Sequence, residues 1–324
     1  MKAFWITDEK EKPLDTLVKD GGFCGIFRRI GCVGDSLSSG EYEIVNEDGT
    51  KSYYDLYEYS WGQFISYTTG SKVYNFSRGG MTASWYNESF AEENDFWNPE
   101  KACQAYIIAL GDNDLFGKEE EVGSIADICL EDRTKNKDTF AGDYAKIIQR
   151  LKTIQPEAKF FLVTMPRDTE NPEDENEQKK ASHAALLHEM AKLFDNTYVI
   201  DLNQYGPVQD AEFRKLFFHN GHMTACGYKL AADVIMSYID YLIRHHMEDF
   251  KLAGKMCIRD RFRTFRYRRR TGAEDLSVWS AQRDGHRAVQ TLRNERAGCQ
   301  RYFSQYQKCQ EDGRAPSAGG MGCP

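Results

Sequence analysis

A serine at the end of an apolar run is the first residue in this sequence with a clear chemical use. Residues 30–37 read IGCVGDSL, so a short apolar stretch ends in Gly34, Asp35 and Ser36. Such a stretch is typical of a buried strand, with Gly34 at its end. Ligands of parallel α/β sheets usually bind at the carboxyl ends of the strands, where Ser36 would lie. The structural alternative is a tight turn in which Ser36 caps the next helix.

Strand patterns and helix patterns alternate through most of the chain. Short apolar runs predict strands at residues 30–34, 72–76, 105–110, 159–164 and 197–200. Apolar residues at helical spacing predict helices at residues 53–68, 144–151, 178–194 and 224–246. Acidic segments between them, at residues 40–51, 117–140 and 166–177, are predicted to be surface loops. This order predicts a three-layer α/β/α fold with a central five-stranded parallel sheet and right-handed crossovers.

Three further polar blocks stand near the ends of predicted elements. Residues 75–82 read NFSRGGMT, residues 111–114 read GDND, and residues 222–228 read HMTACGY. Together with GDSL at residues 34–37, and in this chain order, they resemble the four blocks of the SGNH (GDSL-type) hydrolase family of esterases and lipases. The resemblance covers residues 23–250, and the set is far more specific than any one block.

The resemblance implies a flavodoxin-like fold and serine-dependent hydrolysis of an ester through an acyl-serine intermediate. It makes Ser36 the nucleophile and His222 the base that takes its proton near neutral pH. The backbone N–H groups of Ser36 and Gly80 and the side-chain amide of Asn113 would donate to the oxyanion. Losing one such donor typically costs about 2.7–4 kcal/mol of barrier. The substrate would be a small ester, with acetylated carbohydrates, short acyl esters and thioesters all open, and no metal or organic cofactor is expected.

One block departs from the family pattern. The family usually has an aspartate three residues before the histidine, where it orients the imidazole, but this sequence has His219 there. Another carboxylate could take over, with Asp201 as the first candidate and Asp35 as a further acidic residue of the site. A backbone carbonyl could instead orient a Ser–His dyad. The third alternative is a non-catalytic binding module that keeps the cleft but lacks a working triad.

Each of these residues also has a structural interpretation. Asn113 could cap a turn, and Gly79 rivals Gly80 as the oxyanion donor. His222 could be a loop histidine, and with His219 it could form half of a metal site, which the absence of a nearby Cys/His cluster disfavours. The remaining candidates, His183 and His188, are five apart on a predicted helix and are expected to be surface or packing residues.

Composition sets the broad class of the protein. A chain of 324 residues with 41% hydrophobic content can bury a large core. No run of about 18 apolar residues occurs, and the first ten residues turn acidic before a signal-peptide core could form, so a cytoplasmic protein is expected. Nine cysteines without a Cys-x-x-Cys pair fit reduced thiols. The expected partner is a small-molecule ester, and binding to nucleic acid or to a membrane is not expected. The oligomeric state is open.

The charge pattern divides the chain near residue 255. Residues 1–255 carry 28 Lys and Arg against 43 Asp and Glu, whereas residues 256–324 carry 14 against 7, with 13 Arg and 1 Lys. We interpret residues 1–22 as an N-terminal extension, 23–255 as the SGNH hydrolase domain, and 256–324 as an artefactual or disordered Arg-rich tail. The start of this tail resembles one reading frame of a transposase mosaic end used in library preparation. Its functional alternative is a basic nucleic-acid-binding arm. The acidic body argues against polyanionic substrates.

Overall fold

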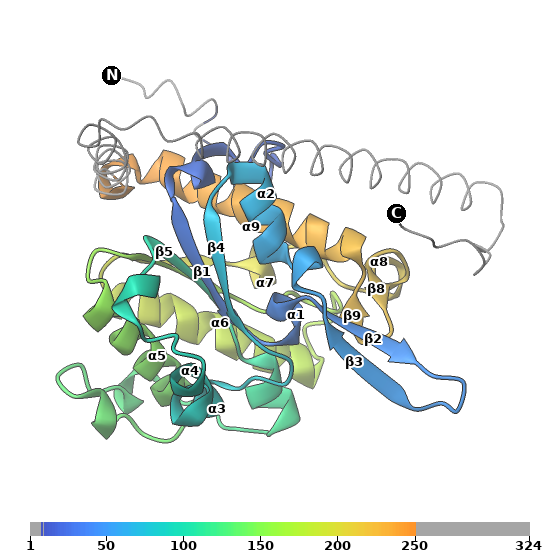
Figure 1. The fold of residues 1–324 in the computed structure, drawn as a ribbon, viewed down its shortest axis with the longest axis horizontal. Helices are drawn as coiled ribbons and strands as arrows, with labels where there is room; N and C mark the ends of the chain where they lie inside the picture. Colours follow the sequence, from blue (N-terminus) through green and yellow to red (C-terminus); the bar gives the residue numbers. More distant parts are fainter. Residues whose placement is uncertain (1–7, 9, 251–324) are drawn as a thin grey trace, which may run out of the picture. The chain divides into compact units, whose positions relative to one another are not determined.

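A five-stranded, all-parallel sheet forms the centre of the protein, as predicted. The computed structural model describes residue 8 and residues 10–250. The strand order is β4-β1-β5-β6-β7, with helices on both faces (Figure 1). The strands are β1 (Arg29–Gly34), β4 (Lys72–Ser77), β5 (Ala105–Ala109), β6 (Lys159–Val163) and β7 (Thr197–Ile200). Strand β1 pairs in parallel with β4 on one side and with β5 on the other. The loops that follow these three strands therefore leave the same edge of the sheet.

Two helical layers cover the sheet. One face carries α2 (Trp61–Thr69), α9 (Ala225–His245) and the 3₁₀ turn η1 (Gly22–Ile26). The other carries α5 (Phe140–Ile154), α6 (Glu175–Leu193) and the short helices α3 (Ala83–Trp85) and α4 (Ala91–Glu93). The small elements at the carboxyl edge are α1 (Ser36–Ser39), α7 (Leu202–Tyr205), α8 (Ala211–Phe217), β8 (Phe218–His219) and β9 (His222–Met223).

Alternate side chains of each strand pack into the hydrophobic cores on opposite faces of the sheet. In β6, Phe160 and Leu162 enter the core beneath α5 and α6, whereas Phe161 and Val163 enter the core beneath α2 and α9. All four are buried because a parallel sheet sandwiched between helices has no solvent-facing side. This explains why the central strands are recognisable in the sequence as continuous apolar runs.

The segment after Ser36 differs from the prediction. Residues 40–51 were predicted to be an acidic loop, but the chain forms an antiparallel hairpin of β2 (Glu41–Val45) and β3 (Lys51–Asp55) that projects from the body of the domain (Figure 1). The predicted helix at residues 53–68 therefore starts only at Trp61, where the Ser60 side chain caps the N–H of Gln63. In β2 the acidic residues Glu41 and Glu43 alternate with Tyr42 and Ile44, and this period of two favours a strand over a loop.

The N-terminal segment packs on the same layer as α9. Leu14 and Val18 contact that core, and Glu11 forms an ion pair with Arg244, with an N–O distance of 2.6 Å. The part of residues 1–22 that is described therefore lies along the domain. The tail predicted at residues 256–324 lies outside the described residues. Within the part of the chain that the structure describes, no helix has the length and apolar character needed to cross a bilayer.

Candidate active site

Ser36 occupies a tight turn between β1 and α1. The Asp35 carboxylate accepts a hydrogen bond from the Leu37 N–H, with an N–O distance of 3.0 Å, and so caps α1. A side chain at Gly34 would place its Cβ 2.1 Å from the Ser38 Oγ, so only glycine allows this close approach. The turn leaves the half-buried Ser36 at the carboxyl edge of the sheet, as the motif predicted.

The surroundings of Asp35 disfavour the charged form of its carboxyl group. Burial and the neighbouring carboxylate of Asp112 raise the pKa of Asp35 to about 7, against the hydrogen bond from Leu37. The side chain is 6% exposed, so water compensates little of the cost of ionisation. Asp35 therefore caps α1 and shapes the turn that holds Ser36.

Two loops bring the predicted oxyanion donors to the same edge. Gly80 adopts a left-handed backbone with φ of 71°, and a Cβ built there would meet nothing within 4 Å. The side-chain amide of Asn113 donates to the Met81 carbonyl at 3.2 Å, which leaves one of its two protons for a ligand. Among the described residues, the backbone N–H groups of Ser36 and Gly80 have no acceptor. These three groups are available to a substrate oxygen.

A buried carboxyl ties these two loops together. Asp114 is fully buried and accepts a hydrogen bond from the Ala83 N–H at 2.7 Å. Burial raises the pKa of Asp114 to about 7. This contact joins the loop after β4 to the loop after β5, and so sets the spacing between Gly80 and Asn113.

His222 lies between two glutamates of the projecting hairpin. Its Nδ1 is 3.4 Å from Glu43 Oε2, and its Nε2 is 3.1 Å from Glu41 Oε1. Glu41 and Glu43 are two residues apart in β2, so both side chains point from the same face of the strand towards β9. Glu43 Oε2 also accepts a hydrogen bond from the Gly221 N–H at 3.1 Å, which links the carboxylate to the backbone beside the histidine.

The two carboxylates favour the charged form of His222. Burial opposes that charge, but the hydrogen bonds and negative charges of Glu41 and Glu43 outweigh it and raise the pKa of His222 above its usual value. The hydrogen bond from Lys51 lowers the pKa of Glu43 despite burial of that carboxyl. Glu43 is 2% exposed and lies 2.7 Å from the Lys51 Nζ. An ionised carboxylate therefore faces Nδ1 at neutral pH.

Tyrosine side chains fix this arrangement to the nucleophile turn. The hydroxyl of the fully buried Tyr228 donates to the Glu41 carbonyl at 2.7 Å and lies 3.4 Å from the Ser36 carbonyl. The Tyr53 ring meets the His222 ring edge to face, with a centroid distance of 5.8 Å. Contacts from helix α9 and from the hairpin thus connect the turn that holds Ser36 with the surroundings of His222. Within the described chain no hydrogen bond joins the Ser36 hydroxyl to His222, because Nε2 is engaged by Glu41.

Asp201 does not orient His222, contrary to the prediction from sequence. Its carboxylate lies 2.7 Å from the His188 Nε2 and accepts hydrogen bonds from Thr164 and from the Gln204 N–H. Asp201 is therefore the cap of α7 and a partner of α6. Its place at the end of β7 made it a reasonable candidate, but β7 is at the far edge of the sheet from β4.

The other histidines have structural positions. His219 is exposed and pairs through the β8–β9 backbone ladder with His222. His183 is fully buried, with Nε2 3.1 Å from the Leu110 carbonyl, and burial lowers its pKa to about 4. A Cβ at Gly111 would lie 2.7 Å from that ring, so the glycine makes room for it. Within residues 8 and 10–250, no three His, Cys, Asp or Glu side chains gather as metal ligands.

Sequence reasoning missed Glu41 and Glu43. Both lie in a segment interpreted as a solvated acidic loop, and nothing in their spacing from His222 marks them. The available signal was the alternation of Glu41, Glu43 and Val45 with Tyr42 and Ile44, which predicts a strand that presents two carboxylates on one face.

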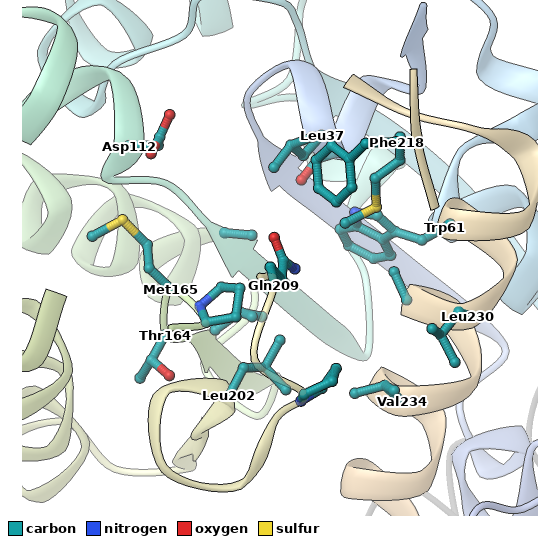
Figure 2. A pocket seen from close by; sticks show the side chains of 18 of the residues that line it. Leu37, Trp61, Asp112, Thr164, Met165, Leu202, Gln209, Phe218, Leu230 and Val234 are labelled. Atoms are coloured by element: carbon teal, nitrogen blue, oxygen red, sulfur yellow. The ribbon is translucent and has the colours of Figure 1, made fainter. Parts of the chain in front are cut away.

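A cavity of about 220 Å³ opens beside these residues (Figure 2). It is bounded by the carboxyl ends of the strands, by α9 and by the loops after β6 and β7. Asp35 and Leu37, on either side of Ser36, line it, and so do Gly221 and Met223, on either side of His222. The residues that line the cavity therefore include the chain neighbours of Ser36 and of His222.

Comparison with known proteins shows the family of this chain. Residues 32–230 match the model of the GDSL-like lipase/acylhydrolase family, which is more than half of the chain. No match was found among functionally curated proteins.

Solved structures that are similar to this chain have low sequence identity to it. A family two carbohydrate esterase from Clostridium thermocellum, in complex with cellohexaose, is 14% identical with a TM-score of 0.47, over 67% of this chain and 64% of that one. A family 3 carbohydrate esterase of the same organism is 16% identical with a TM-score of 0.43, over 67% and 97%. A family 2 enzyme with a carbohydrate binding domain, from Corynascus thermopiles (Myceliophthora fergusii), is 14% identical with a TM-score of 0.46, over 65% of each chain. This chain thus spans about two thirds of the two family 2 structures.

The nucleophile turn, the loops after β4 and β5 and the histidine before α9 all lie within the matched residues. The chain belongs to the GDSL-like lipase/acylhydrolase family and is a carboxylic ester hydrolase.

Proposed function

We propose that the protein hydrolyses a small ester through an acyl intermediate on Ser36, with His222 as base and Glu43 as the residue that orients it. The observation that carries this proposal is the contact of 3.4 Å between Glu43 Oε2 and His222 Nδ1. It supplies the carboxylate that the family places three residues before the histidine and that this sequence lacks. Glu43 replaces Asp201, which pairs with His188.

The first step requires a local change at His222. Its Nε2 faces Glu41, and a base must instead receive the Ser36 proton at that nitrogen. When the imidazole loses its proton its attraction to Glu41 weakens, and Nε2 becomes available to Ser36. Glu43 keeps Nδ1 protonated throughout, which fixes the tautomer that accepts at Nε2.

The chemical steps then follow the serine-hydrolase scheme. The Ser36 Oγ attacks the ester carbonyl while His222 takes its proton, and the oxyanion receives hydrogen bonds from the Ser36 and Gly80 N–H groups and the Asn113 amide. The C–O bond breaks, and the alcohol leaves with the proton from His222. Water then attacks the acyl-serine with His222 as base again, which releases the acid and restores Ser36.

A small, uncharged ester fits the electrostatics of this site. Glu41 and Glu43 give the surroundings of His222 a negative character, which repels phosphorylated or acidic substrates. Acetylated carbohydrates and short acyl esters are both consistent with that character.

The decisive experiment compares p-nitrophenyl acetate hydrolysis by the wild type, Ser36→Ala and Ser38→Ala. Ser38 lies in the same helix and its buried hydroxyl has no hydrogen-bond partner among described groups, so its loss should leave turnover nearly unchanged. We expect Ser36→Ala to reduce kcat to background with an unchanged thermal melt. Equal turnover in wild type and Ser36→Ala would reject the proposal.

A fluorophosphonate probe tests directly whether Ser36 is the nucleophile, since it labels only an activated serine. Labelling of the wild type but not of Ser36→Ala supports the proposal, and equal labelling of the two rejects it.

A further inference from the structure

Strand β3 forms the uncovered edge of the projecting hairpin. Its partner β2 contacts the rest of the domain, because the Tyr228 hydroxyl donates to the Glu41 carbonyl and the Gly221 N–H donates to the Glu43 carboxylate. β2 also contacts β9, and Figure 1 shows β3 on the other side of β2. Among the described residues β3 pairs with β2 alone, so one of its two sides is open to a partner.

The pairing pattern shows which backbone groups of β3 point outward. In an antiparallel pair, opposite residues alternate between those that exchange two hydrogen bonds and those that exchange none. The Leu56 N–H donates to the Gly40 carbonyl at the base of the hairpin, so the bonded positions of β3 are the even-numbered ones. The N–H and C=O groups of Lys51, Tyr53 and Asp55 therefore point away from β2. None of these groups has a partner among the described residues.

The outward groups of β3 are complementary to the same groups of a second copy. When two β3 strands meet antiparallel about a two-fold axis, with Tyr53 opposite Tyr53 of the second copy, each outward N–H faces an outward C=O. The same register places Lys51 opposite Asp55 of the second copy at both ends of the pair. Cross-strand pairs of opposite charge and of aromatic rings both stabilise a sheet. Self-pairing is thus complementary in backbone and in charge.

The two charged side chains keep capacity for these contacts. The Lys51 side chain is 54% exposed, and its Nζ lies 2.7 Å from Glu43, which leaves further ammonium donors for a second carboxylate. Asp55 is exposed, and its Oδ1 accepts a hydrogen bond from the Ser39 hydroxyl at 2.6 Å while Oδ2 has no partner among the described residues. A lysine on an edge strand usually discourages pairing. A carboxylate opposite the lysine reverses that effect.

Large apolar side chains are exposed on the same hairpin. Tyr53 and Tyr54 are each 52% exposed, and Ile44 is 45% exposed. Edge strands of monomeric proteins are usually protected from association, so aromatic side chains on an open edge indicate an interaction surface. Self-pairing would join the two hairpins into one four-stranded sheet, with Tyr54 and Ile44 of both copies on one face. A two-stranded hairpin gains stability when strands are added to it.

We propose that β3 is a self-association surface, through which two copies of the chain form a two-fold dimer with a continuous sheet of two hairpins. A pair of five-residue strands is small beside a standard interface of about 1,600 Å², so we expect a dissociation constant on the order of 10 µM. The Tyr53 ring also contacts the His222 ring, with centroids 5.8 Å apart, so this interface borders the candidate active site. Self-association through β3 does not depend on ester hydrolysis by Ser36.

Charge reversal tests the register of the pair. Sedimentation velocity of the full chain should show a monomer–dimer equilibrium between about 1 and 200 µM. Lys51→Asp and Asp55→Lys each place like charges opposite one another, and each should weaken the dimer about tenfold or more. An equimolar mixture of these two variants restores opposite charges at both ends and should dimerise like the wild type. Glu189→Lys makes the same charge change as Asp55→Lys on the exposed side of α6, so it should leave the equilibrium unchanged.

A disulfide tests the centre of the pair. In Tyr53→Cys the two new thiols face each other across the axis, where bonded antiparallel residues have Cα atoms about 5.5 Å apart, within the range of disulfides. Mild oxidation should give a covalent dimer, and peptide mass spectrometry should locate its disulfide between two copies of position 53. Tyr67→Cys, at a residue of α2 that is 51% exposed, is the matched control. This measurement stays informative when a charge-reversed variant does not fold.

The results either support or reject β3 as the interface. Dimerisation of the wild type, its loss in both charge reversals and its recovery in their mixture support the proposal. A chain that is monomeric at every concentration, and whose Tyr53→Cys variant crosslinks no more than Tyr67→Cys, rejects self-association and leaves the edge to a partner of different sequence. A dimer that both charge reversals leave unchanged rejects β3, because another surface then holds the copies together.

Discussion

Glu43 Oε2 lies 3.4 Å from Nδ1 of His222, although 179 residues separate the two in the chain. The contact joins a hairpin inserted directly after the nucleophile helix to the short strand that carries the histidine. Glu41, on the same face of the same strand, contacts the opposite ring nitrogen at 3.1 Å. Two glutamates of one strand thus face the two nitrogens of one imidazole, and their expected effects on catalysis are opposite.

Removal of the Glu43 charge should impair the chemical step. Glu43→Gln leaves the shape of the side chain but no longer stabilises the imidazolium or fixes its tautomer, so kcat should fall about 10²- to 10⁴-fold with KM little changed. Steady-state kinetics on an ester such as p-nitrophenyl acetate measure this. Glu43→Gln also breaks the ion pair between Glu43 and Lys51. Lys51→Met breaks the same ion pair but keeps the Glu43 carboxylate, and so serves as the control. Asp201→Asn should leave kcat within about twofold; a large loss there and none in Glu43→Gln would restore Asp201 to the mechanism.

Removal of the Glu41 charge should move the acid limb of the pH profile. His222 must be neutral to act as a base, so activity is lost as pH falls through its raised pKa. Glu41→Gln takes away a hydrogen bond and a negative charge that favour the imidazolium, which lowers this pKa. The acid limb of kcat/KM should therefore shift to lower pH, with higher activity near pH 6 than in the wild type. A shift to higher pH would contradict the competition between Glu41 and Ser36 for Nε2.

Truncation of Asn113 should remove one oxyanion donor. Asn113→Ala is expected to lower kcat about 10²- to 10³-fold, which corresponds to about 2.7–4 kcal/mol of barrier, with a small change in KM. Since Asn113 also donates to the Met81 carbonyl, the thermal melt must be measured beside the kinetics. Asn87→Ala removes an amide that bridges the Ala83 and Asp143 carbonyls on the neighbouring loop and serves as the comparison. Equal losses of kcat in both variants would assign Asn113 a structural role only.

Asp35 should make stability depend on pH in a defined direction. Its folded pKa of about 7 lies above the ordinary value of 3.8, so the unfolded chain releases this proton first as pH rises. The free energy of unfolding should therefore decrease between about pH 4 and pH 7, by about 1.4 kcal/mol for each pKa unit. Asp35→Asn keeps an acceptor for the Leu37 N–H and removes the ionisation, so it should make this part of the urea-unfolding curve less steep. The remaining slope includes the contribution of Asp114, whose pKa is also raised to about 7. An identical slope in wild type and variant would show that Asp35 is not the group responsible.

Local sequence pattern was sufficient to predict the central sheet. Each central strand is buried on both faces, which requires a continuous apolar run, and each run in β1, β4 and β5 is followed by a polar block at the same edge of the sheet. The fold class follows from these apolar runs, and the blocks that contain Ser36, Gly80 and Asn113 lie at one edge of the sheet because strand ends in a parallel sheet converge. The roles of these residues and of His222 are implied by the family resemblance and stay predictions.

The partners of His222 were decided by the tertiary structure. Asp201 and Glu43 are both acidic residues outside the histidine block, and only the packing of the hairpin against β9 selects between them. A strand position indicates which face a side chain leaves from, but not which distant element lies opposite that face. The cavity has the same origin, since it is formed by loops and helices whose sequences carry no shared pattern.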